Sequence, residues 1–305
     1  EETQGLLFEK LSEDNKPVFL ENKELDFSYS AGDSARFRGN AFFQRGVVGV
    51  ALRLIASKIP VLSDLNLPIE MLSEVARQKQ GFFLVVGPVG QGKSTTLASM
   101  VNLINLERSE HIITIEDPIE YLYPEGRAII DQREVRFDTK DFHTALVSMF
   151  RQDVNVGLIG EMRGYETIST AVTAAETGHL VFSTLHTNNA SQTIDRIIDS
   201  FPAGQQNQIR LQLAGSLIGI FSQRLVPRIS GGVVPAFELL LNNNAVSNLI
   251  REGRTHEIDI VIETGAEQNM IDMNHSLAEL VRKGEITSET AFHYTLNPNG
   301  LERLL

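Results

Sequence analysis

The stretch Gly87-Pro88-Val89-Gly90-Gln91-Gly92-Lys93-Ser94-Thr95 decides the fold of this chain. It matches the phosphate-binding pattern G-x-x-x-x-G-K-[ST] at every fixed position. The unbroken apolar run over 82–86 before it predicts a buried parallel strand. Residues 94–104 after it carry apolar side chains at helical spacing, so the stretch is predicted to join a strand to the start of a helix.

A glycine-rich loop at the start of a helix forms a cradle for phosphate. Its glycines let backbone N–H groups turn inward, and the helix dipole adds positive potential there. In this interpretation Lys93 reaches the β- and γ-phosphates of a nucleoside triphosphate and the Ser94 hydroxyl binds Mg²⁺. The alternative, a flexible glycine-rich turn, is disfavoured by the flanking strand and helix. The residues predicted to bind the nucleotide are Gly87, Val89, Gly90, Gln91, Gly92, Lys93, Ser94 and Thr95.

The composition is typical of a soluble globular protein, with 42% apolar and 22% charged residues among 305. The longest apolar runs, such as 217–221, are far shorter than the roughly 18 residues of a membrane span, so no direct membrane insertion is expected. A net charge of −12 argues against duplex nucleic acid as a partner. The sequence has no cysteine, which excludes disulfides and thiolate metal sites and fits a reducing cytosol.

The order of the expected elements divides the chain in two. Residues 1–58 are expected to form a small β-rich domain with three strands and turns at Ala31-Gly32-Asp33 and Arg45-Gly46. Two prolines mark 59–68 as a linker. Over 69–305, strands alternate with helices, which predicts an α/β domain with a mostly parallel sheet and a mainly helical end over 256–305. The expected strands are 82–86, 111–115, 128–131, 156–160, 179–185 and 233–241, and the expected helices are 69–80, 94–104, 141–152 with Asp141 as its cap, 165–176, 191–200, 244–252 and a helical tail over 273–305.

Polar groups follow four of the expected strands. The phosphate loop, Glu116, Glu161 and His186 each fall just past the carboxyl end of a strand. In open α/β sheets that edge is where ligands bind. These groups, distant in sequence, are therefore expected on one rim of the sheet, around one phosphate chain.

Each of these side chains has a candidate role in splitting a triphosphate. Glu116 is the candidate to orient and polarise the attacking water, and Glu161 stands where an acid would hold Mg²⁺ through its water shell. His186 is the candidate to contact the γ-phosphate and report its presence. The structural alternatives are an acid that caps the following helix and a histidine that only forms a hydrogen bond. For Arg163, a place in the site and a simple ion pair both stay open.

Positive charge in this acidic chain gathers in the N-terminal domain, at Arg36, Arg38, Arg45 and Arg53. Arg36 and Arg38 share one face of a strand because side chains alternate with a period of two. Two interpretations stay open: a solvated basic face, or arginines that meet a triphosphate on a neighbouring subunit.

Taken together, these motifs resemble those of the secretion-superfamily ATPases, and more narrowly those of the type IV pilus retraction (PilT-like) ATPases. Four motifs carry the resemblance to the family's Walker A, Asp box, Walker B and His box, namely 87–95, 115–120, 158–163 and 183–187. The resemblance covers nearly the whole chain and extends to Arg36-Phe37-Arg38, to 173–178, to a helix expected from Gln205 to Leu225, and to 245–252, which is close to the motif A-I-R-N-L-I-R-E.

The resemblance implies a homohexameric ring in which each subunit has a PAS-like N-terminal domain and a RecA-like ATPase domain, with ATP between them. N-terminal arginines would reach the nucleotide, and Arg38 and Arg53 match the family best, followed by Arg36. Hydrolysis would rotate the domains and drive an inner-membrane platform protein that disassembles the pilus. A cytoplasmic location, peripheral at the inner membrane, is implied as well.

The chain departs from the family pattern at several places. The usual R-Q-D-P-D is replaced by Arg151-Gln152-Asp153-Val154-Asn155, Gly164 stands where an acid normally follows E-M-R, and Ser247 replaces the motif arginine. The N-terminal domain is expected to lack the family's first strands.

Four functions were compared with these observations. The first is an ATP-hydrolysing motor for pilus retraction. The second is a pilus-extension or type II secretion ATPase, which usually carries a four-cysteine zinc site that this cysteine-free chain cannot form. The third is a nucleotide-gated assembly scaffold with little turnover, suggested by the departures from the pattern. The last, a RecA-like nucleic-acid translocase, is disfavoured by the acidic net charge.

Overall fold

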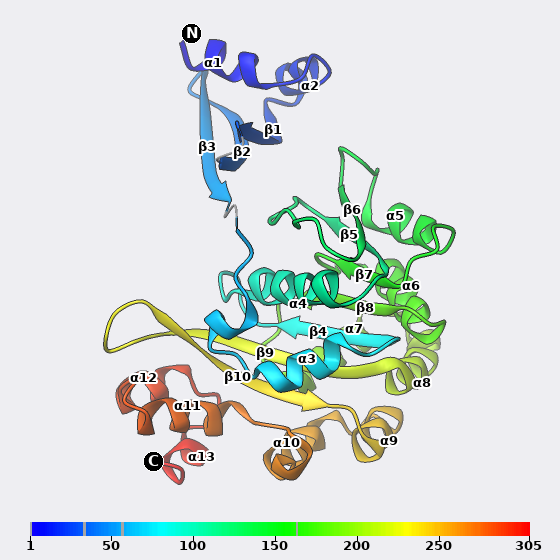
Figure 1. Ribbon diagram of the computed structural model, residues 1–305, viewed down its shortest axis with the longest axis vertical. Helices are drawn as coiled ribbons and strands as arrows, with labels where there is room; N and C mark the ends of the chain where they lie inside the picture. The colour runs from blue at the N-terminus through cyan, green and yellow to red at the C-terminus, as the bar shows by residue number, and fades with distance from the viewer. Residues whose placement is uncertain (1, 33–34, 56–57, 163) are drawn as a thin grey trace. The chain divides into compact units, whose positions relative to one another are not determined.

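A seven-stranded sheet organises the larger of the two packing units of this chain (Figure 1). The computed structural model describes residues 2–32, 35–55, 58–162 and 164–305. The large unit consists of Pro60–Asp117 and Tyr123–Leu305. The small unit consists of the chain up to Ile59 together with Pro118–Leu122.

The sheet of the large unit has the strand order β10-β9-β4-β8-β7-β5-β6. All neighbouring pairs are parallel except β10 and β9, which are antiparallel. The α/β fold with a mostly parallel sheet, predicted from the sequence, is therefore confirmed. The strands are β4 (Gly81–Val86), β5 (His111–Glu116), β6 (Ile129–Glu134), β7 (Val156–Ile159), β8 (Leu180–Leu185), β9 (Leu217–Pro227) and β10 (Val233–Leu241).

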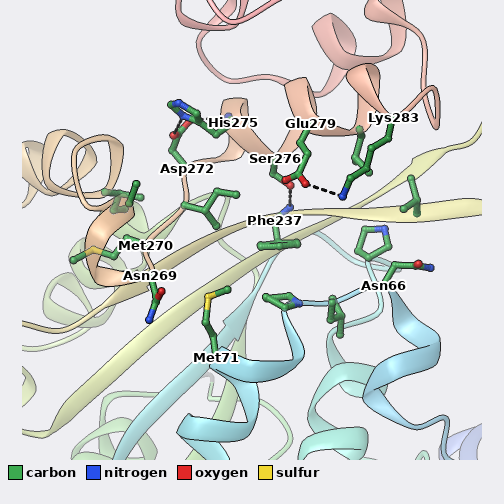
Figure 2. A pocket seen from close by; sticks show the side chains of 18 of the residues that line it. Asn66, Met71, Phe237, Asn269, Met270, Asp272, His275, Ser276, Glu279 and Lys283 are labelled. Carbon is green, nitrogen blue, oxygen red and sulfur yellow. Dashed lines mark hydrogen bonds and ion pairs between the residues drawn. The ribbon is translucent and has the colours of Figure 1, made fainter.

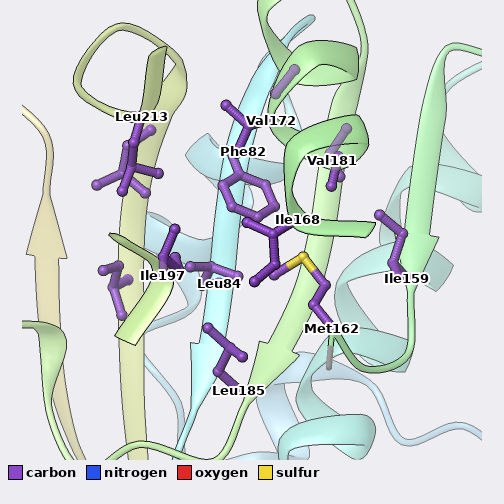
Figure 3. Packing of buried hydrophobic residues seen from close by; sticks show 14 of the residues in the cluster. Phe82, Leu84, Ile159, Met162, Ile168, Val172, Val181, Leu185, Ile197 and Leu213 are labelled. Carbon is purple, nitrogen blue, oxygen red and sulfur yellow. The ribbon is translucent and has the colours of Figure 1, made fainter. Parts of the chain in front are cut away.

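Strand β4 lies at the centre of two hydrophobic cores because its side chains alternate between the two faces of the sheet. Phe82 and Leu84 enter the core on one face, and Phe83 and Val85 enter the core on the other. Figure 3 shows the first core, in which Phe82 and Leu84 pack against helix residues such as Ile168. That face is covered by α5 (Phe142–Met149), α6 (Tyr165–Glu176), α7 (Ala190–Asp199) and α8 (Gln206–Ser216), and the opposite face by α3 (Ile69–Ala76) and α4 (Lys93–Glu107).

Short polar side chains start several of these helices. The Asp141 carboxylate accepts a hydrogen bond from Thr144 N at 2.7 Å at the start of α5, which confirms the predicted cap. The backbone and side-chain hydrogen bonds from Thr144 lower the pKa of Asp141. Asn189 caps α7 in the same way through Gln192 N. Each cap satisfies an N–H group that the helix itself leaves unpaired.

The helix expected from Gln205 to Leu225 is wrong in its second half. Helix α8 ends at Ser216, and the chain continues as β9. Strand β9 is paired with β4 on one side and β10 on the other, and nearly all of its residues are buried. A strand that is buried on both faces has no alternating pattern, so its apolar run cannot be told from a buried helix by periodicity.

The boundaries of several other elements differ from the expectation; α5 ends at Met149 rather than Gln152, and α4 extends to Glu107. Helix α3 ends at Ala76 rather than Gln80, and β6 extends to Glu134, since it pairs with β5 as far as Glu116. The C-terminal tail is helical as predicted but is interrupted by turns. Its helices include α9 (Asn244–Glu252), α10 (Ile258–Glu263), α11 (Met273–Arg282), α12 (Ser288–Tyr294) and α13 (Pro298–Glu302).

The small unit has a three-stranded antiparallel sheet in the order β1-β2-β3, as expected. Two helices before the sheet were not predicted, and they supply the packing partner that such a small sheet needs. Leu7 and Phe19 from the helices pack with Phe27 and Ala41 from the strands. Asp33 of the predicted first turn lies outside the described residues. The elements are α1 (Glu2–Lys10), α2 (Asn15–Asn22), β1 (Glu24–Ala31), β2 (Ala35–Gln44) and β3 (Val47–Ile55).

In the part of the chain that the structure describes, no helix combines the length and the apolar content that crossing a bilayer requires.

Truncation of a core side chain should test the central position of β4. Phe83 is fully buried, so Phe83→Ala should lower the free energy of unfolding by about 3–5 kcal/mol through lost transfer energy and an unfilled cavity. Leu211→Ala is the control, because Leu211 is 59% exposed on α8 and should cost less than about 0.5 kcal/mol. Denaturant unfolding measures both. Equal losses for the two variants would contradict the assigned core.

Candidate functional site

The phosphate loop connects β4 to α4 in a backbone path that requires glycine. Gly87 and Gly92 have φ values of +146° and +78°, which L-residues with a side chain rarely adopt. A Cβ atom on Gly87 would lie 2.5 Å from the carbonyl oxygen of Gln223, and one on Gly92 would lie 2.9 Å from the Nε2 atom of Gln223. The loop therefore passes so close to β9 that neither position has room for a side chain.

Lys93 is the first residue of α4 and is largely buried. Its Nζ donates to the carbonyl oxygens of Gly87 at 2.9 Å and Pro88 at 2.8 Å, so the ammonium folds back over the loop. The half-buried Ser94 and Thr95 follow in the first turn of the helix, and Val89 at the loop tip is 78% exposed. A cation and the helix N-terminus thus face the same loop, as anion binding requires.

The four strands that precede the predicted site residues end at the same edge of the sheet. Ile115 of β5 pairs with Ile159 of β7, Ile159 pairs with Ser183 of β8, and Leu185 of β8 pairs with Val86 of β4. Parallel strands in this register bring their following residues to one rim. Glu116, Glu161, His186 and the phosphate loop lie on that rim.

His186 contacts both the phosphate-loop lysine and one of the acids. Its Nδ1 lies 3.3 Å from Lys93 Nζ, and its Nε2 lies 3.6 Å from Glu161 Oε1. An ammonium group can only donate hydrogen bonds, so Nδ1 is the acceptor and the ring hydrogen is on Nε2. The imidazole therefore turns its N–H toward the acid side of the rim.

Glu116 is held by side chains of its own and the adjacent strand. Its Oε1 accepts hydrogen bonds from Thr114 Oγ1 at 2.7 Å and from Gln132 Nε2 at 3.5 Å. A Cβ atom built on Gly160 would lie 3.4 Å from the Cα atom of Glu116, so Glu116 is next to the residue that precedes Glu161. The two acids come from adjacent strands at the same rim.

Two residues that hold the loop were missed in the sequence. Thr96 Oγ1 donates to Gln223 Oε1 at 2.7 Å, and Gln223 Nε2 donates to the carbonyl oxygen of Gln91 at 2.7 Å. The side chain of Gln91 in turn accepts from Leu225 N at 2.6 Å. Gln223 was hidden by the wrong assignment of β9 to a helix. The available signal was a run of three polar residues, 222–224, between the apolar stretches 217–221 and 225–226.

The predicted arginines lie in the small unit, whereas the phosphate loop lies in the large one. Arg38 of β2 pairs directly with Arg53 of β3. Arg36 is two residues from Arg38 on the same strand, and its side chain is outside the described part of the chain, as is the whole of Arg163. Arg38 is half-buried and Arg53 is exposed.

A separate cavity of about 680 Å³ is lined by Asn66, α3, β10 and α11 (Figure 2). Phe237 and Met71 form part of its apolar wall, and Glu279 and Lys283 at its rim form an ion pair at 2.7 Å. The hydroxyl of Ser276 accepts a hydrogen bond from Phe237 N at 3.0 Å and fixes α11 to β10.

A phosphate loop on a parallel sheet, with acids and a histidine along the carboxyl rim, defines a P-loop nucleotide-binding domain. The chain belongs more narrowly to the Type II/IV secretion system protein family, whose family model matches residues 36–296. That membership agrees with the sequence motifs.

Individual relatives match over most of the chain. It is 46% identical to the uncharacterized protein YggR of Escherichia coli, over 93% of this chain and 87% of that protein. It is 44% identical to a twitching motility protein of Neisseria gonorrhoeae, over 95% of this chain and 78% of that protein. A crystal structure of the pilus retraction motor PilT with bound ADP has a TM-score of 0.93 and 48% identity, with 99% of this chain and 86% of that chain covered.

Removal of the Gln223 amide should loosen the phosphate loop. Gln223→Ala deletes the hydrogen bonds to Gln91 and Thr96, so ADP should bind about tenfold more weakly, the equivalent of one hydrogen bond. Gln212→Ala, a half-buried glutamine of α8 whose amide binds Glu176, is the matched control. Titration calorimetry with ADP and Mg²⁺ measures both affinities. Unchanged affinity in Gln223→Ala would show that β9 does not support the loop.

Proposed function

We propose that this chain is a hexameric ATP-hydrolysing motor that powers type IV pilus retraction by coupling hydrolysis to domain rotation. One observation carries the proposal: Lys93, His186 and Glu161 are in contact on a sheet rim that also holds Glu116. Similarity to a pilus retraction motor over nearly the whole chain supports the assignment of this site to that machine.

Binding of ATP begins at the phosphate loop. Backbone N–H groups at the start of α4 surround the phosphates, and Lys93 exchanges its carbonyl partners for the β- and γ-phosphate oxygens. The Ser94 hydroxyl and the Glu161 carboxylate are the oxygen donors that suit Mg²⁺, the latter through water. When bound, Mg²⁺ neutralises charge on the β- and γ-phosphate oxygens.

We assign the positioning of the attacking water to Glu116. The hydrogen bonds from Thr114 and Gln132 fix the orientation of its carboxylate, and such orientation is what a group that aligns a nucleophile needs. We assign detection of the terminal phosphate to His186, which turns its Nε2–H toward Glu161 and lies beside Lys93. Through its contacts with Lys93 and Glu161, His186 would link the presence of phosphate in the loop to the position of Glu161.

Membership of the family supports the remaining proposals, which concern the N-terminal arginines and the external partner. Arg38 and Arg53, together with Arg36, are assigned to a nucleotide on the neighbouring subunit, where their charge would stabilise the transition state. The proposed external partner is the inner-membrane platform protein of the pilus, which places the motor at the cytoplasmic face of that membrane. No nucleic acid is proposed as a partner.

The role of Glu116 can be tested by replacing its carboxylate with an amide. Glu116→Gln should slow steady-state ATP hydrolysis about 10²- to 10⁴-fold and leave ATP binding within a few-fold of wild type, because only the transition state loses an interaction. Glu176→Gln, at the exposed end of α6, is the control. A Glu116→Gln protein that turns over ATP at the wild-type rate would remove Glu116 from this role.

The wild-type chain and the Glu116→Gln variant also test whether this motor retracts pili. A bacterium that lacks its retraction ATPase should regain twitching motility with the wild-type chain and not with Glu116→Gln. Rapid ATP hydrolysis without restored motility would instead favour a pilus-extension or secretion motor. A wild-type chain that binds ATP with negligible turnover would favour the assembly scaffold suggested by Gly164 and Val154-Asn155.

Mixing two inactive variants tests whether the arginines act between subunits. Arg38→Ala and Glu116→Gln should each be inactive alone. Co-assembled from mixed, refolded chains, they should regain measurable ATPase activity, because some sites then combine Glu116 of one subunit with Arg38 of its neighbour. A matched mixture of Glu116→Gln with Lys93→Ala should stay inactive, since both substitutions affect the same subunit's half of the site. No recovery in the first mixture would place Arg38 in its own subunit's site or outside any site.

A further inference from the structure

Three buried polar side chains lie on an otherwise apolar face of the β9–β10 pair. Ser222 and Arg224 of β9 are two residues apart, and Glu238 of β10 pairs with Ser222, so all three share one face of the sheet. Their exposed fractions are 0%, 7% and 7%. On the same face, Ile220 and Leu240 belong to the hydrophobic core.

All three side chains bind the short segment between β8 and α7. Ser222 Oγ donates to the carbonyl oxygen of Asn188 at 2.9 Å, and Arg224 Nη2 donates to the carbonyl oxygen and to Oδ1 of Asn188, both at 3.0 Å. Glu238 Oε1 accepts from Ala190 N, the first residue of α7, at 2.8 Å. An anion at a helix N-terminus is electrostatically favourable.

Glu238 and Arg224 are ionisable groups in the protein interior, where burying a charge is costly. Desolvation raises the pKa of Glu238, the Ala190 N–H and the Arg224 guanidinium lower it, and Asp259 and Asp272 raise it, which brings the pKa to about 7. Burial likewise lowers the pKa of Arg224. A buried acid of this kind adds little to stability compared with an apolar side chain of similar size. The cluster is therefore better explained by the geometry that it imposes.

The segment held in this way carries His186. His186 is four residues before Ala190, and it bridges Lys93 and Glu161. Arg224 also lies beside the phosphate loop, because a Cβ atom built on Gly87 would be 3.5 Å from its Nη1. The cluster thus fixes the histidine segment relative to the loop that holds the phosphates.

We propose that Glu238 and Arg224 are positioning residues, which hold the segment His186–Asn189 so that the imidazole stays between Lys93 and Glu161. The inference rests on the proposed ATPase function, because it assigns these residues an effect on turnover through His186. Neither residue contacts the reacting phosphate in this scheme. Their contribution is the alignment of a group that does.

Kinetic constants of Glu238 variants test the proposal. Glu238→Ala removes the acceptor of Ala190 N, so kcat should fall at least about tenfold with KM for ATP within about twofold, because a small misplacement affects the transition state most. Glu238→Gln keeps an acceptor oxygen and should retain kcat within about threefold. Glu285→Ala is the control, since Glu285 also binds an arginine, Arg228, which directly follows β9, at 2.7 Å. An unchanged kcat in Glu238→Ala would overturn the proposal.

A double-mutant cycle separates positioning from a general loss of stability. If Glu238 acts through His186, the protein with both Glu238→Ala and His186→Ala should be no slower than His186→Ala alone. Additive losses would show that Glu238 acts independently of the histidine and would overturn the proposal. If Glu238→Ala does not fold, Ser222→Ala replaces it in the cycle, because this smaller change also releases Asn188.

Amide hydrogen exchange gives a readout that does not depend on turnover. Exchange over 186–191 should speed up in Glu238→Ala and stay at the wild-type rate in Glu285→Ala. A wild-type protein without ATPase activity would defeat the proposed function. An active wild type whose Glu238→Ala variant shows unchanged exchange and unchanged kcat would defeat only the present inference.

Discussion

The common register of four parallel strands is the constraint on which the site depends. Because β4, β8, β7 and β5 are parallel and paired in register up to one edge of the sheet, residues at and after their ends are brought to one rim although they are distant in the sequence. Lys93, His186 and Glu161 are separated by tens of residues, yet their side chains touch. A shift of one strand by a single residue would turn its side chains to the opposite face and separate these groups.

The second requirement is the close approach of the phosphate loop to β9. Gly87 and Gly92 let the loop backbone pass against Gln223, and the amide of Gln223 then holds the loop in place. Strand β9 and its partner β10 also provide Arg224 and Glu238 for the histidine segment. Strands β9 and β10 carry none of the four sequence motifs, yet they support both the phosphate loop and the segment that carries His186.

The sequence was sufficient for the features that depend on local pattern. The loop 87–95 is defined by fixed residue types, and the apolar runs before Gly87, Glu116 and His186 predict the strands that end at the rim. Features that depend on long-range packing could not be read in this way. Strand β9 is buried on both faces and has no period of two, and α1 and α2 carry no strong amphipathic pattern. The partners of Gln223 and Glu238 become visible only when β9 and β10 are placed in the sheet.

The pairing of β9 on both of its edges has a mechanical consequence. One edge is hydrogen-bonded to β4, which leads into the phosphate loop, and the other to β10, on which α11 is fixed through Ser276. The phosphate loop and α11 are thus connected through a continuous hydrogen-bonded sheet. A displacement of the phosphate loop is therefore expected to carry α11 with it.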